Sequence, residues 1–386
     1  MQWKIPLMKV YVSDADDIGK RLADTLRSGY IAEGDVTKQF SDQLKKYFKF
    51  PNVLLTNSCT SSLTVALYAA GVGPGDKVIT SPHTCMASAV PIKTLGGTVI
   101  WGDLDPKTGL LDPDDVRKKI QKYNAKAVIC VHWGGDVCDV VSLRNICEEY
   151  GVTLIEDAAQ ALGAHTKEGT LVGCNTADYT CFSFQAVKHL TTGDGGMVVS
   201  GSQACYERVK PLTWFGIDRD KFRREDTGEI DWSIDVKTAG FKMHMNDLAS
   251  TLGLSQLPFV TNVVLLKHKL TGKKLEKELS DIPGLEVPKR GSPFSAYWFF
   301  HVLTRGPQDR VDLIQFLREK GIQASSAHMR IDKYSCFNDS PKDTLPGADE
   351  FSKRQLCLPC GWWLDDNDID YLKKALNAFY KSNKHE

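Results

Sequence analysis

The sequence predicts an α/β fold, with a large, mixed but mostly parallel sheet followed by a smaller α/β unit. Short apolar runs alternate with helical patterns over the first two thirds of the chain, which is typical of a sheet covered on both faces. The rhythm changes near residue 257, where a long helical pattern begins. We therefore expect a large domain over residues 1–257, whose N-terminal segment can pack with the small domain, and a small C-terminal domain over residues 258–386.

The predicted strands of the large domain are nearly continuous apolar runs, as expected for strands buried on both faces. They cover residues 52–56, 77–82, 97–105, 125–133 and 152–159. The helix predicted over 60–71 opens at a hydroxyl cap and closes at a glycine, and the helices over 113–124 and 142–151 are amphipathic.

The C-terminal part contains three predicted helices and one predicted strand. The helices cover residues 257–281, 309–321 and 365–381, and the strand covers residues 297–304. The last helix carries acids in its first turn and lysines later, an order that the helix dipole favours.

Charge and cysteine content exclude several classes of protein. Over 386 residues, 48 Lys and Arg balance 48 Asp and Glu, so no net field attracts nucleic acid or an anionic membrane. No apolar run is long enough for a membrane span, and the first residues do not resemble a signal peptide. The 11 cysteines, an odd number, fit reduced thiols in a cytoplasmic protein better than a disulfide framework.

A turn that can hold phosphate is the first candidate site. In NSCTSS (57–62) an apolar strand turns into a helix, so Ser58, Thr60 and Ser61 place hydroxyls and free N–H groups at a helix N-terminus. Taken alone, a plain helix cap explains these residues better than a phosphate site.

An acidic strand end and a lysine are the second and third features. In TLIEDAAQALGA (153–164), Asp157 would point into the crevice at the carboxyl ends of the strands, although a cap explains it equally well. In CFSFQAVKHLTTGDGGMVVS (181–200), Lys188 lies between an apolar run and a glycine-rich turn. It is either a solvent-exposed loop lysine or a buried amine with a chemical role, because burying a charged amine costs free energy.

Together these features meet the requirements of pyridoxal phosphate (PLP). The cofactor needs an amine for a Schiff base, a carboxylate that keeps its ring nitrogen protonated, and donors for its phosphate. The segment between Asp157 and Lys188 has about the length of one strand–loop–strand unit, so the chain can return and place the two side chains over one pocket. Desolvation and a cationic ring would lower the pKa of Lys188 and make the amine nucleophilic.

Several segments also follow one another in a recognisable order. SFQAVKHLTTGDGG (183–196) is similar to the pattern S-F-x-x-x-K-x-x-x-x-G-[ED]-G-G, and IEDAAQALGA (155–164) to E-D-x-A-[QH]-x-x-G-A. Further matching segments are LRSGYIAEGDVTKQFSDQLKKYF (26–48), AGFKMHMNDLASTLGLSQL (239–257) and LCLPCGWWL (356–364). Over nearly its whole length the chain thus resembles the DegT/DnrJ/EryC1/StrS family of PLP-dependent sugar aminotransferases.

The resemblance implies a type I PLP fold with a seven-stranded mixed sheet, and a homodimer with each site built at the interface. It implies that Lys188 forms the Schiff base and that Asp157 binds the pyridinium nitrogen. It also implies that Gln160 lies near the cofactor ring or its 3-oxygen. Residues expected to hold the phosphate are Ser183, Thr60 and Ser61.

The chain departs from the family pattern at some cofactor positions. Cys59 replaces the usual glycine before the phosphate threonine, and Cys85 occupies the position where an aromatic residue often stacks on the ring. His244 occupies a position where asparagine or arginine is common, and Lys242 lies two residues before it; either could reach the partner's cofactor phosphate. Residues expected to line the substrate side are Tyr30, His328, Arg330 and Tyr334.

The implied reaction is a ping-pong transamination. An amino acid, L-glutamate in most family members, leaves its amino group on the cofactor as pyridoxamine phosphate, which then aminates a nucleotide-linked keto-deoxysugar at C3 or C4. The product would serve a glycan such as lipopolysaccharide O-antigen, or a secondary metabolite.

Three alternatives remain open at this point. One is a related sugar dehydratase, which has histidine in place of the Schiff-base lysine; here Lys188 holds the position and His189 is adjacent. Another is a PLP-binding regulatory protein without turnover. A third, a nucleotide-binding α/β enzyme without PLP, lacks a G-x-G-x-x-G or Walker-type loop.

The sequence does not favour a metal site. CLPC (357–360) is a lone C-x-x-C and predicts buried thiols in a β turn rather than a zinc site. His132 ends a strand near the presumed crevice and is as consistent with a structural histidine as with a site residue. Trp362 and Trp363 are expected to pack in the core or at the dimer interface.

Overall fold

The computed structural model describes residues 3–382 and contains a seven-stranded sheet with the order β1-β7-β6-β5-β4-β2-β3. Strand β7 runs antiparallel to both of its neighbours, β1 and β6, and the other pairs are parallel. The predicted mixed, mostly parallel sheet is therefore confirmed. Its strands are β1 (Val53–Thr56), β2 (Lys77–Thr80), β3 (Thr98–Trp101), β4 (Ala127–Val131), β5 (Thr153–Asp157), β6 (Tyr179–Ser183) and β7 (Gly196–Ser200).

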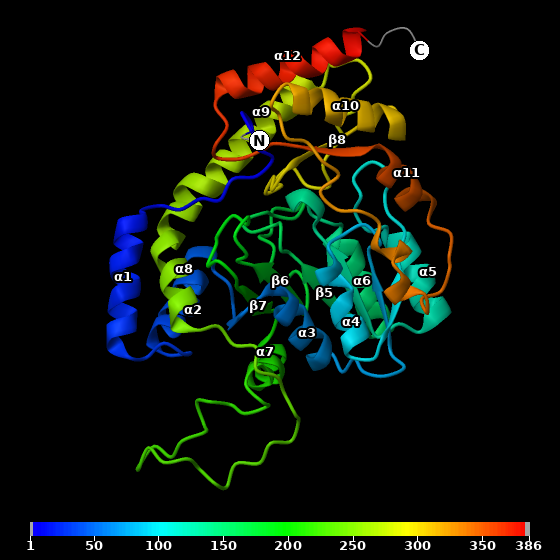
Figure 1. Cartoon of the computed structure of the whole chain (residues 1–386). Helices are drawn as coiled ribbons and strands as arrows, with labels where there is room; N and C mark the ends of the chain where they lie inside the picture. The colour runs from blue at the N-terminus through cyan, green and yellow to red at the C-terminus, as the bar shows by residue number, and fades with distance from the viewer. Residues whose placement is uncertain (1–2, 383–386) are drawn as a thin grey trace.

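Helices surround this sheet, as Figure 1 shows. They begin at side-chain caps that the sequence supplies, such as Ser58, Asp112 and Asp139. The helices along this part of the chain are α3 (Cys59–Ala69), α4 (Val90–Thr94), α5 (Pro113–Tyr123), α6 (Val140–Tyr150) and α7 (Gln203–Val209), with short 3-10 turns η1 (Met86–Ser88), η2 (Trp133–Gly135) and η3 (Lys210–Thr213).

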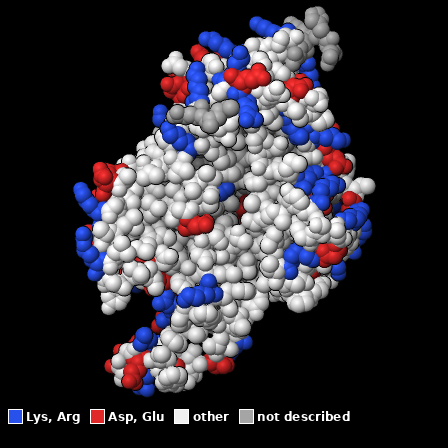
Figure 2. Space-filling model, viewed as in Figure 1, with Lys and Arg blue, Asp and Glu red and all other residues white. Residues whose placement is uncertain are grey.

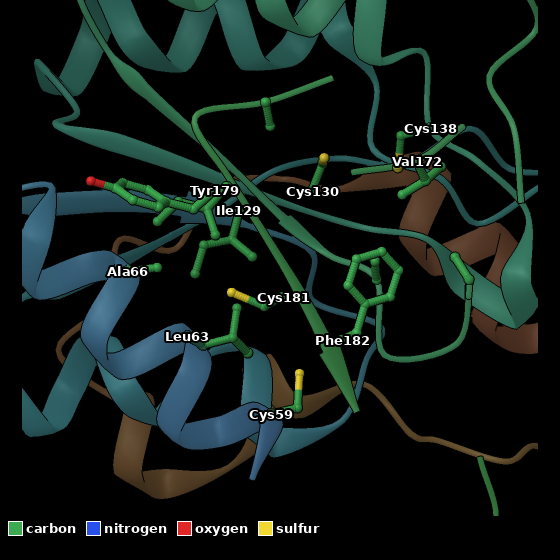
Figure 3. Close-up of a cluster of buried hydrophobic side chains, with 14 of the residues drawn as sticks. Cys59, Leu63, Ala66, Ile129, Cys130, Cys138, Val172, Tyr179, Cys181 and Phe182 are labelled. Carbon is green, nitrogen blue, oxygen red and sulfur yellow. The ribbon is translucent and has the colours of Figure 1, made fainter. Parts of the chain in front are cut away.

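Helix α3 packs directly against the sheet and carries the residues of the candidate cradle at its first turn. Figure 3 shows Leu63 and Ala66 of α3 lying against Ile129 and Cys181 of the sheet. All four side chains are buried. Most of its residues are buried, including most of the small hydroxyl residues of its first turns, and this packing fixes the position of its N-terminus.

The N-terminal helices pack on a later part of the chain. Helices α1 (Ala15–Ser28) and α2 (Asp35–Phe48) both contact α8 (Asp247–Phe259). Gly34 gives α2 no side-chain cap, and the buried carboxylate of Asp247 takes that role. It accepts hydrogen bonds from the N–H groups of Gly34 and Thr37, both at 2.9 Å.

Helix α8 continues through a π-turn, η4 (Val260–Val264), into α9 (Leu265–Leu279). The predicted start at residue 257 is therefore wrong by about three turns, because the helix is capped by Asn246, which accepts from the N–H of Ala249. Residue 257 lies inside this helix, and the division of the chain into two domains stays a prediction.

The continuous helix Asp247–Leu279 is long and apolar enough to cross a membrane by length and composition. However, 44% of its most apolar window is buried inside the protein. Core helices of soluble proteins pass the same test, so this helix gives weak evidence for a membrane span.

A second hydrophobic core lies beyond the helix α9 (Figure 1). Its two strands pair antiparallel, and Ile5 of the N-terminal segment joins it through a bridge to Ile322. Cys357 and Cys360 are buried as predicted, although Cys357 lies in a strand rather than in a turn. The elements of this part are β8 (Phe300–Leu303), α10 (Pro307–Glu319), η5 (Ile331–Lys333), η6 (Ser335–Phe337), α11 (Pro346–Arg354), β9 (Gln355–Leu358) and α12 (Asp366–Ser382).

An arm formed by residues 215–240 projects from the body between α7 and α8 (Figure 1). It carries exposed apolar side chains, and Trp232 is 89% exposed. An ion pair between Arg219 and Glu33 ties the arm to the loop between α1 and α2, where Tyr30 is 80% exposed. The arm and this loop therefore lie on one side of the protein.

Candidate active site

The N-terminus of α3 forms an open turn bounded by β7. Ser58 caps the helix by accepting from the N–H of Ser61 at 3.1 Å, which leaves the N–H groups of Cys59 and Thr60 at the open helix end. A Cβ added at Gly196 would lie 2.6 Å from the backbone nitrogen of Cys59. Only glycine therefore lets β7 approach this turn so closely, and the turn has the geometry of an anion cradle.

Asp157 ends β5 at the carboxyl edge of the sheet, where the sequence predicts a crevice. Its side chain is buried, and Oδ2 accepts a hydrogen bond from Ser88 at 2.6 Å. Thr84 lies 2.9 Å from the Ser88 hydroxyl, and Oδ1 accepts from the N–H of Ala159. These bonds fix the carboxylate in one orientation.

Lys188 is half-buried and lies over the ring of Trp298, with 3.7 Å between Nζ and the ring centroid. Burial lowers the pKa of the Lys188 amine to about 8, and the charge of Asp157 acts in the opposite direction. An amine with this pKa is substantially neutral near pH 8 and is therefore nucleophilic.

Four of the predicted residues lie close enough for their charges to affect one another's pKa. They are Cys59, Cys85, Asp157 and Lys188. Burial raises the pKa of the Cys59 thiol; Asp157 raises it further, whereas Lys188 lowers it. Cys85, which is exposed, acts on both Cys59 and Lys188. The structure thus brings residues from four separate segments, following β1, β2, β5 and β6, to one place.

Gln160 and Ser183 border this place but already make contacts of their own. Gln160 is buried, and its Oε1 accepts from the N–H of Gly134 at 2.7 Å. Its Nε2 has no acceptor among residues 3–382 and keeps a donor for another group. Ser183 ends β6 opposite Gly196, and its Oγ accepts from the N–H of Gln185.

Lys242 and His244 lie on a segment that passes beside the α3 turn. Asn57 donates its N–H to the carbonyl of Met243, and Thr56 bridges to His244. Lys242 is exposed, with Nζ 5.7 Å from the ring centroid of Phe215. Within the described part of the chain, no hydrogen bond joins either side chain to the cradle, and the role predicted for them at a partner's phosphate stays a prediction.

The residues predicted for the substrate side do not all gather at Lys188. His328 does, because its ring lies 5.3 Å from that of Trp133 and 6.4 Å from that of Trp298. Burial and, to a smaller extent, the nearby charge of Lys188 lower the pKa of His328 to about 4. This imidazole is neutral at physiological pH.

The other three residues lie in different surroundings. Arg330 makes two hydrogen bonds to Asp332, at 2.8 and 2.6 Å, and one to Asp349, so its guanidinium is already bound by carboxylates. Tyr30 and Tyr334 are exposed, and no hydrogen bond joins either side chain to the residues around Lys188 within the described chain.

His132 belongs to a buried polar network behind the site. Its Nε2 faces Glu156 at 3.3 Å, and its Nδ1 accepts from the N–H of Cys138 at 3.2 Å. Cys130, His132 and Cys138 could offer metal ligands within 4.8 Å of one another, but both ring nitrogens are already engaged. We therefore interpret this histidine as structural.

Sequence reasoning missed two residues of the site. Ser88 follows Cys85 by three positions, and that hydroxyl was the available signal for a partner of Asp157. Trp298 had no such signal, because it comes from beyond α9 and meets Lys188 only in the folded chain. His189 points away from the site and bonds the carbonyl of Ala296.

A comparison of the sequence with models of protein families agrees with this arrangement of residues. The family model described as "DegT/DnrJ/EryC1/StrS aminotransferase family" matches residues 12–377. The chain belongs to this family.

DegT/DnrJ/EryC1/StrS relatives align along nearly the whole chain. The spore coat polysaccharide biosynthesis protein SpsC of Bacillus subtilis (strain 168) is 30% identical over 370 residues, which are 94% of each chain. A dTDP-4-dehydro-2,3,6-trideoxy-D-glucose 4-aminotransferase of Saccharopolyspora spinosa is 29% identical over 371 residues, covering 94% of this chain and 93% of its own.

Solved structures of DegT/DnrJ/EryC1/StrS proteins share the fold. The sugar aminotransferase CalS13 from Micromonospora echinospora superimposes with a TM-score of 0.87 at 31% identity, over 97% of this chain and 99% of its own. The PLP-form of the putative sugar aminotransferase Spr1654 from Streptococcus pneumoniae superimposes with a TM-score of 0.86 at 25% identity, over 98% and 99% of the two chains. The chain is thus a PLP-dependent enzyme of the sugar aminotransferase family with the type I fold.

The residues present fit the cofactor of DegT/DnrJ/EryC1/StrS enzymes. The open α3 turn suits the phosphate, and its closeness to Gly196 leaves no room for a side chain in the wall of the cradle. Asp157 presents a fixed carboxylate for a ring nitrogen, and Lys188 presents an amine of lowered pKa. The three chemical requirements of PLP are met in one place.

Proposed function

We propose that the chain transfers an amino group from an amino acid, L-glutamate in the first instance, to a nucleotide-linked keto-deoxysugar. The observation that carries this proposal is the convergence of Lys188 and Asp157 beside the open N-terminus of α3. PLP supplies an electron sink that stabilises negative charge at the carbon bearing the amino group. The protein's own residues then have four tasks.

Lys188 supplies the amine that attaches the cofactor, and afterwards moves the proton between the two carbons that exchange the amino group. Its lowered pKa suits both tasks, because a general base works best when its pKa lies near the working pH. Asp157, oriented by Ser88, keeps the proton on the ring nitrogen. The Thr60–Ser61 turn and Ser183 would hold the phosphate of the cofactor, and Nε2 of Gln160 would be available to its ring oxygen.

Cys59 and Cys85 complete the cofactor pocket in this proposal. Cys59 lies at the first turn of α3 and would pack beside the cofactor, and the exposed Cys85 would lie against the ring in place of an aromatic side chain. A thiol contributes less contact area than an aromatic ring, so we expect the cofactor to be held mainly through its phosphate and ring nitrogen.

The substrate side is proposed from neighbouring groups. His328 is neutral and lies beside Trp298, so it can donate or accept a hydrogen bond from a sugar hydroxyl. Amination at C4 has the support of the Saccharopolyspora spinosa relative, whose name specifies a 4-aminotransferase. The product would be an amino sugar for a glycan, as the polysaccharide role of the Bacillus subtilis relative suggests.

Two alternatives are less consistent with the site. A sugar dehydratase would need a histidine in place of Lys188, and the adjacent His189 instead bonds the Ala296 carbonyl. A regulatory protein without turnover would not need an amine whose pKa is lowered to about 8. The regulatory alternative is distinguishable by the experiment described below.

We also propose a cytoplasmic homodimer in which the arm and the Tyr30 loop of one copy reach the site of the other. Exposed apolar side chains cluster on these tied segments. They are Tyr30, Ile31, Phe215, Trp232 and Val236. Figure 2 shows a broad central face of the protein with few charged side chains, which gather instead around its rim. Lys242, beside Phe215, would then face the partner's cofactor phosphate.

An absorption titration with PLP tests the proposal. The wild-type protein should develop a visible cofactor band that L-glutamate bleaches, whereas Lys188→Ala should develop none. Bleached protein should then regain the band with the correct keto-sugar nucleotide, and a panel that differs in nucleotide and in keto position identifies it. A Lys188-dependent band that no amino donor bleaches would favour a regulatory protein, and the absence of any Lys188-dependent band would refute the proposal.

A further inference from the structure

Trp298 makes two contacts with the Lys188 segment, one through its ring and one through its N–H. The ring face lies 3.7 Å from Nζ of Lys188, well inside the range of a cation–π interaction. The indole N–H donates to the carbonyl of Val187, the residue before the lysine, at 2.8 Å. One side chain therefore holds both the amine and the backbone next to it.

Trp298 is itself rigidly held. Its side chain is 5% exposed, and its backbone N–H donates to the carbonyl of Gly134 at 2.9 Å. The N–H of Gly134 in turn donates to Gln160. The preceding residue, Tyr297, has φ 48°, a left-handed conformation that a tyrosine adopts only where the surrounding structure requires it. The backbone that carries the ring is thus held in one conformation.

Lys188 depends on this ring because it has few other partners. Among residues 3–382, no side chain accepts a hydrogen bond from its amine. Burial disfavours the ammonium form, and Asp157, Cys59 and Cys85 oppose this only through space. An aromatic face attracts the ammonium where water is excluded.

We propose that Trp298 is a positioning residue for Lys188: its ring face holds the amine inside the site, and its N–H fixes the backbone of Val187. The role of Lys188 itself rests on the proposed function. Whenever its amine is not bonded to the cofactor, Lys188 would lie over the Trp298 ring, in place for proton transfer. The residue adds a second support for the lysine that the sequence pattern around Lys188 does not reveal.

Chemical labelling of the protein without cofactor tests the ring contact. Acetic anhydride reacts only with neutral amines, so the pH dependence of Lys188 acetylation, followed by mass spectrometry of its peptide, reports the pKa. Trp298→Phe, which keeps a ring face, should leave the midpoint near that of the wild type. Trp298→Leu should lower it by about half to one and a half pH units, because the ammonium loses its attraction.

Hydrogen exchange tests the second contact. Trp298→Phe loses the indole N–H but keeps the ring, so the amides of residues 185–190 should exchange several-fold faster than in the wild type while the labelling midpoint stays. Trp298→Met provides a second aliphatic variant in case the leucine variant does not fold, and unfolding curves identify the folded variants.

The chain contains a matched control at its surface. Trp362 donates its Nε1–H to the carbonyl of Lys9 at 3.2 Å, and Nζ of Lys9 lies 5.3 Å from the Trp362 ring centroid. Because Lys9 is exposed, Trp362→Leu should leave the labelling midpoint of Lys9 unchanged.

Two results would overturn the proposal. One is an equal shift of the Lys188 labelling midpoint in the phenylalanine and aliphatic variants, and the other is a rise of that midpoint toward the ordinary lysine pKa. Either result means that packing or water entry controls the pKa of the amine. The test does not depend on the proposed function. Loss of the Lys188-dependent cofactor band would refute that function, while the labelling profile of the cofactor-free protein would still show whether Trp298 positions the lysine.

Discussion

The hydroxyl of Ser88 donates to Asp157, with 2.6 Å between Oγ and Oδ2, in the buried interior at the edge of the sheet. This bond orients the carboxylate that we propose for the cofactor ring. A charge-assisted bond of this length is among the stronger hydrogen bonds in proteins.

Removal of this hydroxyl should weaken both stability and cofactor binding. Ser88→Ala leaves a buried carboxylate oxygen without its donor, which should lower the free energy of unfolding of the cofactor-free protein by about 1–3 kcal/mol. The affinity for PLP should fall as well, because Asp157 loses its fixed orientation. Denaturant unfolding and a PLP absorbance titration measure the two effects. Ser142→Ala is the matched control: that hydroxyl donates to Asp139 at 2.9 Å but is exposed, so both quantities should stay close to wild type.

A methyl group at Gly196 should open the phosphate cradle. The added Cβ would lie 2.6 Å from the nitrogen of Cys59 and 2.6 Å from the carbonyl carbon of Ser58, so β7 or α3 must move. We expect Gly196→Ala to cost about 1–3 kcal/mol in stability and to weaken PLP binding strongly. Calorimetric titration of the cofactor and thermal unfolding measure this. Gly19→Ala has open space within 4 Å on α1 and should be neutral or slightly stabilising; similar behaviour of the two variants would contradict the close approach.

Stability of the cofactor-free protein should depend on pH through Lys188. Its pKa in the folded state, about 8, lies below the ordinary value of 10.5, so between these values the unfolded chain binds more protons. The contribution of this group to stability therefore rises with pH across that window, and below pH 8 the fold must bury an ammonium. Lys188→Met should raise the free energy of unfolding at pH 7 by roughly 1–3 kcal/mol and by less at pH 10. Lys9→Met, at an exposed site, should show no such difference in urea unfolding at the two pH values. A gain that is equal at both pH values would show that the methionine improves packing only.

We expect Arg330 to stabilise the fold rather than to bind a phosphate of the substrate. Its guanidinium binds Asp332 twice and Asp349 once, so Arg330→Met would leave the buried carboxylate of Asp332 with only the exposed Lys333, at 3.5 Å, as an ion-pair partner. The expected loss of stability is about 3 kcal/mol. Arg144→Met, which removes an exposed pair with Glu148, should cost well under about 1 kcal/mol. If Arg330→Met instead keeps the wild-type stability and raises only the KM for the nucleotide sugar, the arginine binds substrate.

Residues at the ends of strands could be predicted from the sequence because topology brings them together. Asp157 ends an apolar run and the cradle follows another, and in a mostly parallel sheet such ends meet at one edge. Lys188 was identifiable because a charged residue interrupts an apolar segment before a glycine turn. These features, taken together with the family resemblance, predicted the chemistry of the site, although no one of them did so alone.

Contacts made by side chains across the fold were not accessible in this way. Trp298 lies in an aromatic stretch before β8 that predicts only a buried strand, and nothing local shows which ring meets Lys188. Arg330 looked available to phosphate because its carboxylate partners are defined by the folded loop. The start of α8 was missed because this helix is buried on many sides and shows little amphipathic periodicity, so that only the Asn246 cap marked it.

The continuous helix Asp247–Leu279 connects the two hydrophobic cores and contains a π-turn between α8 and α9. Its first part, α8, packs against α1 and α2, whereas Leu275 and Leu279 of α9 lie in the second core. Since α9 extends for 15 residues, or about 22 Å, a bend of about 5° at Val260–Val264 would displace its far end by roughly 2 Å. The second core, with the strand that follows Trp298, would travel with it. Trp298 itself packs in the first core and donates its backbone N–H to Gly134, so its spacing to Lys188 would be preserved while the second core moves.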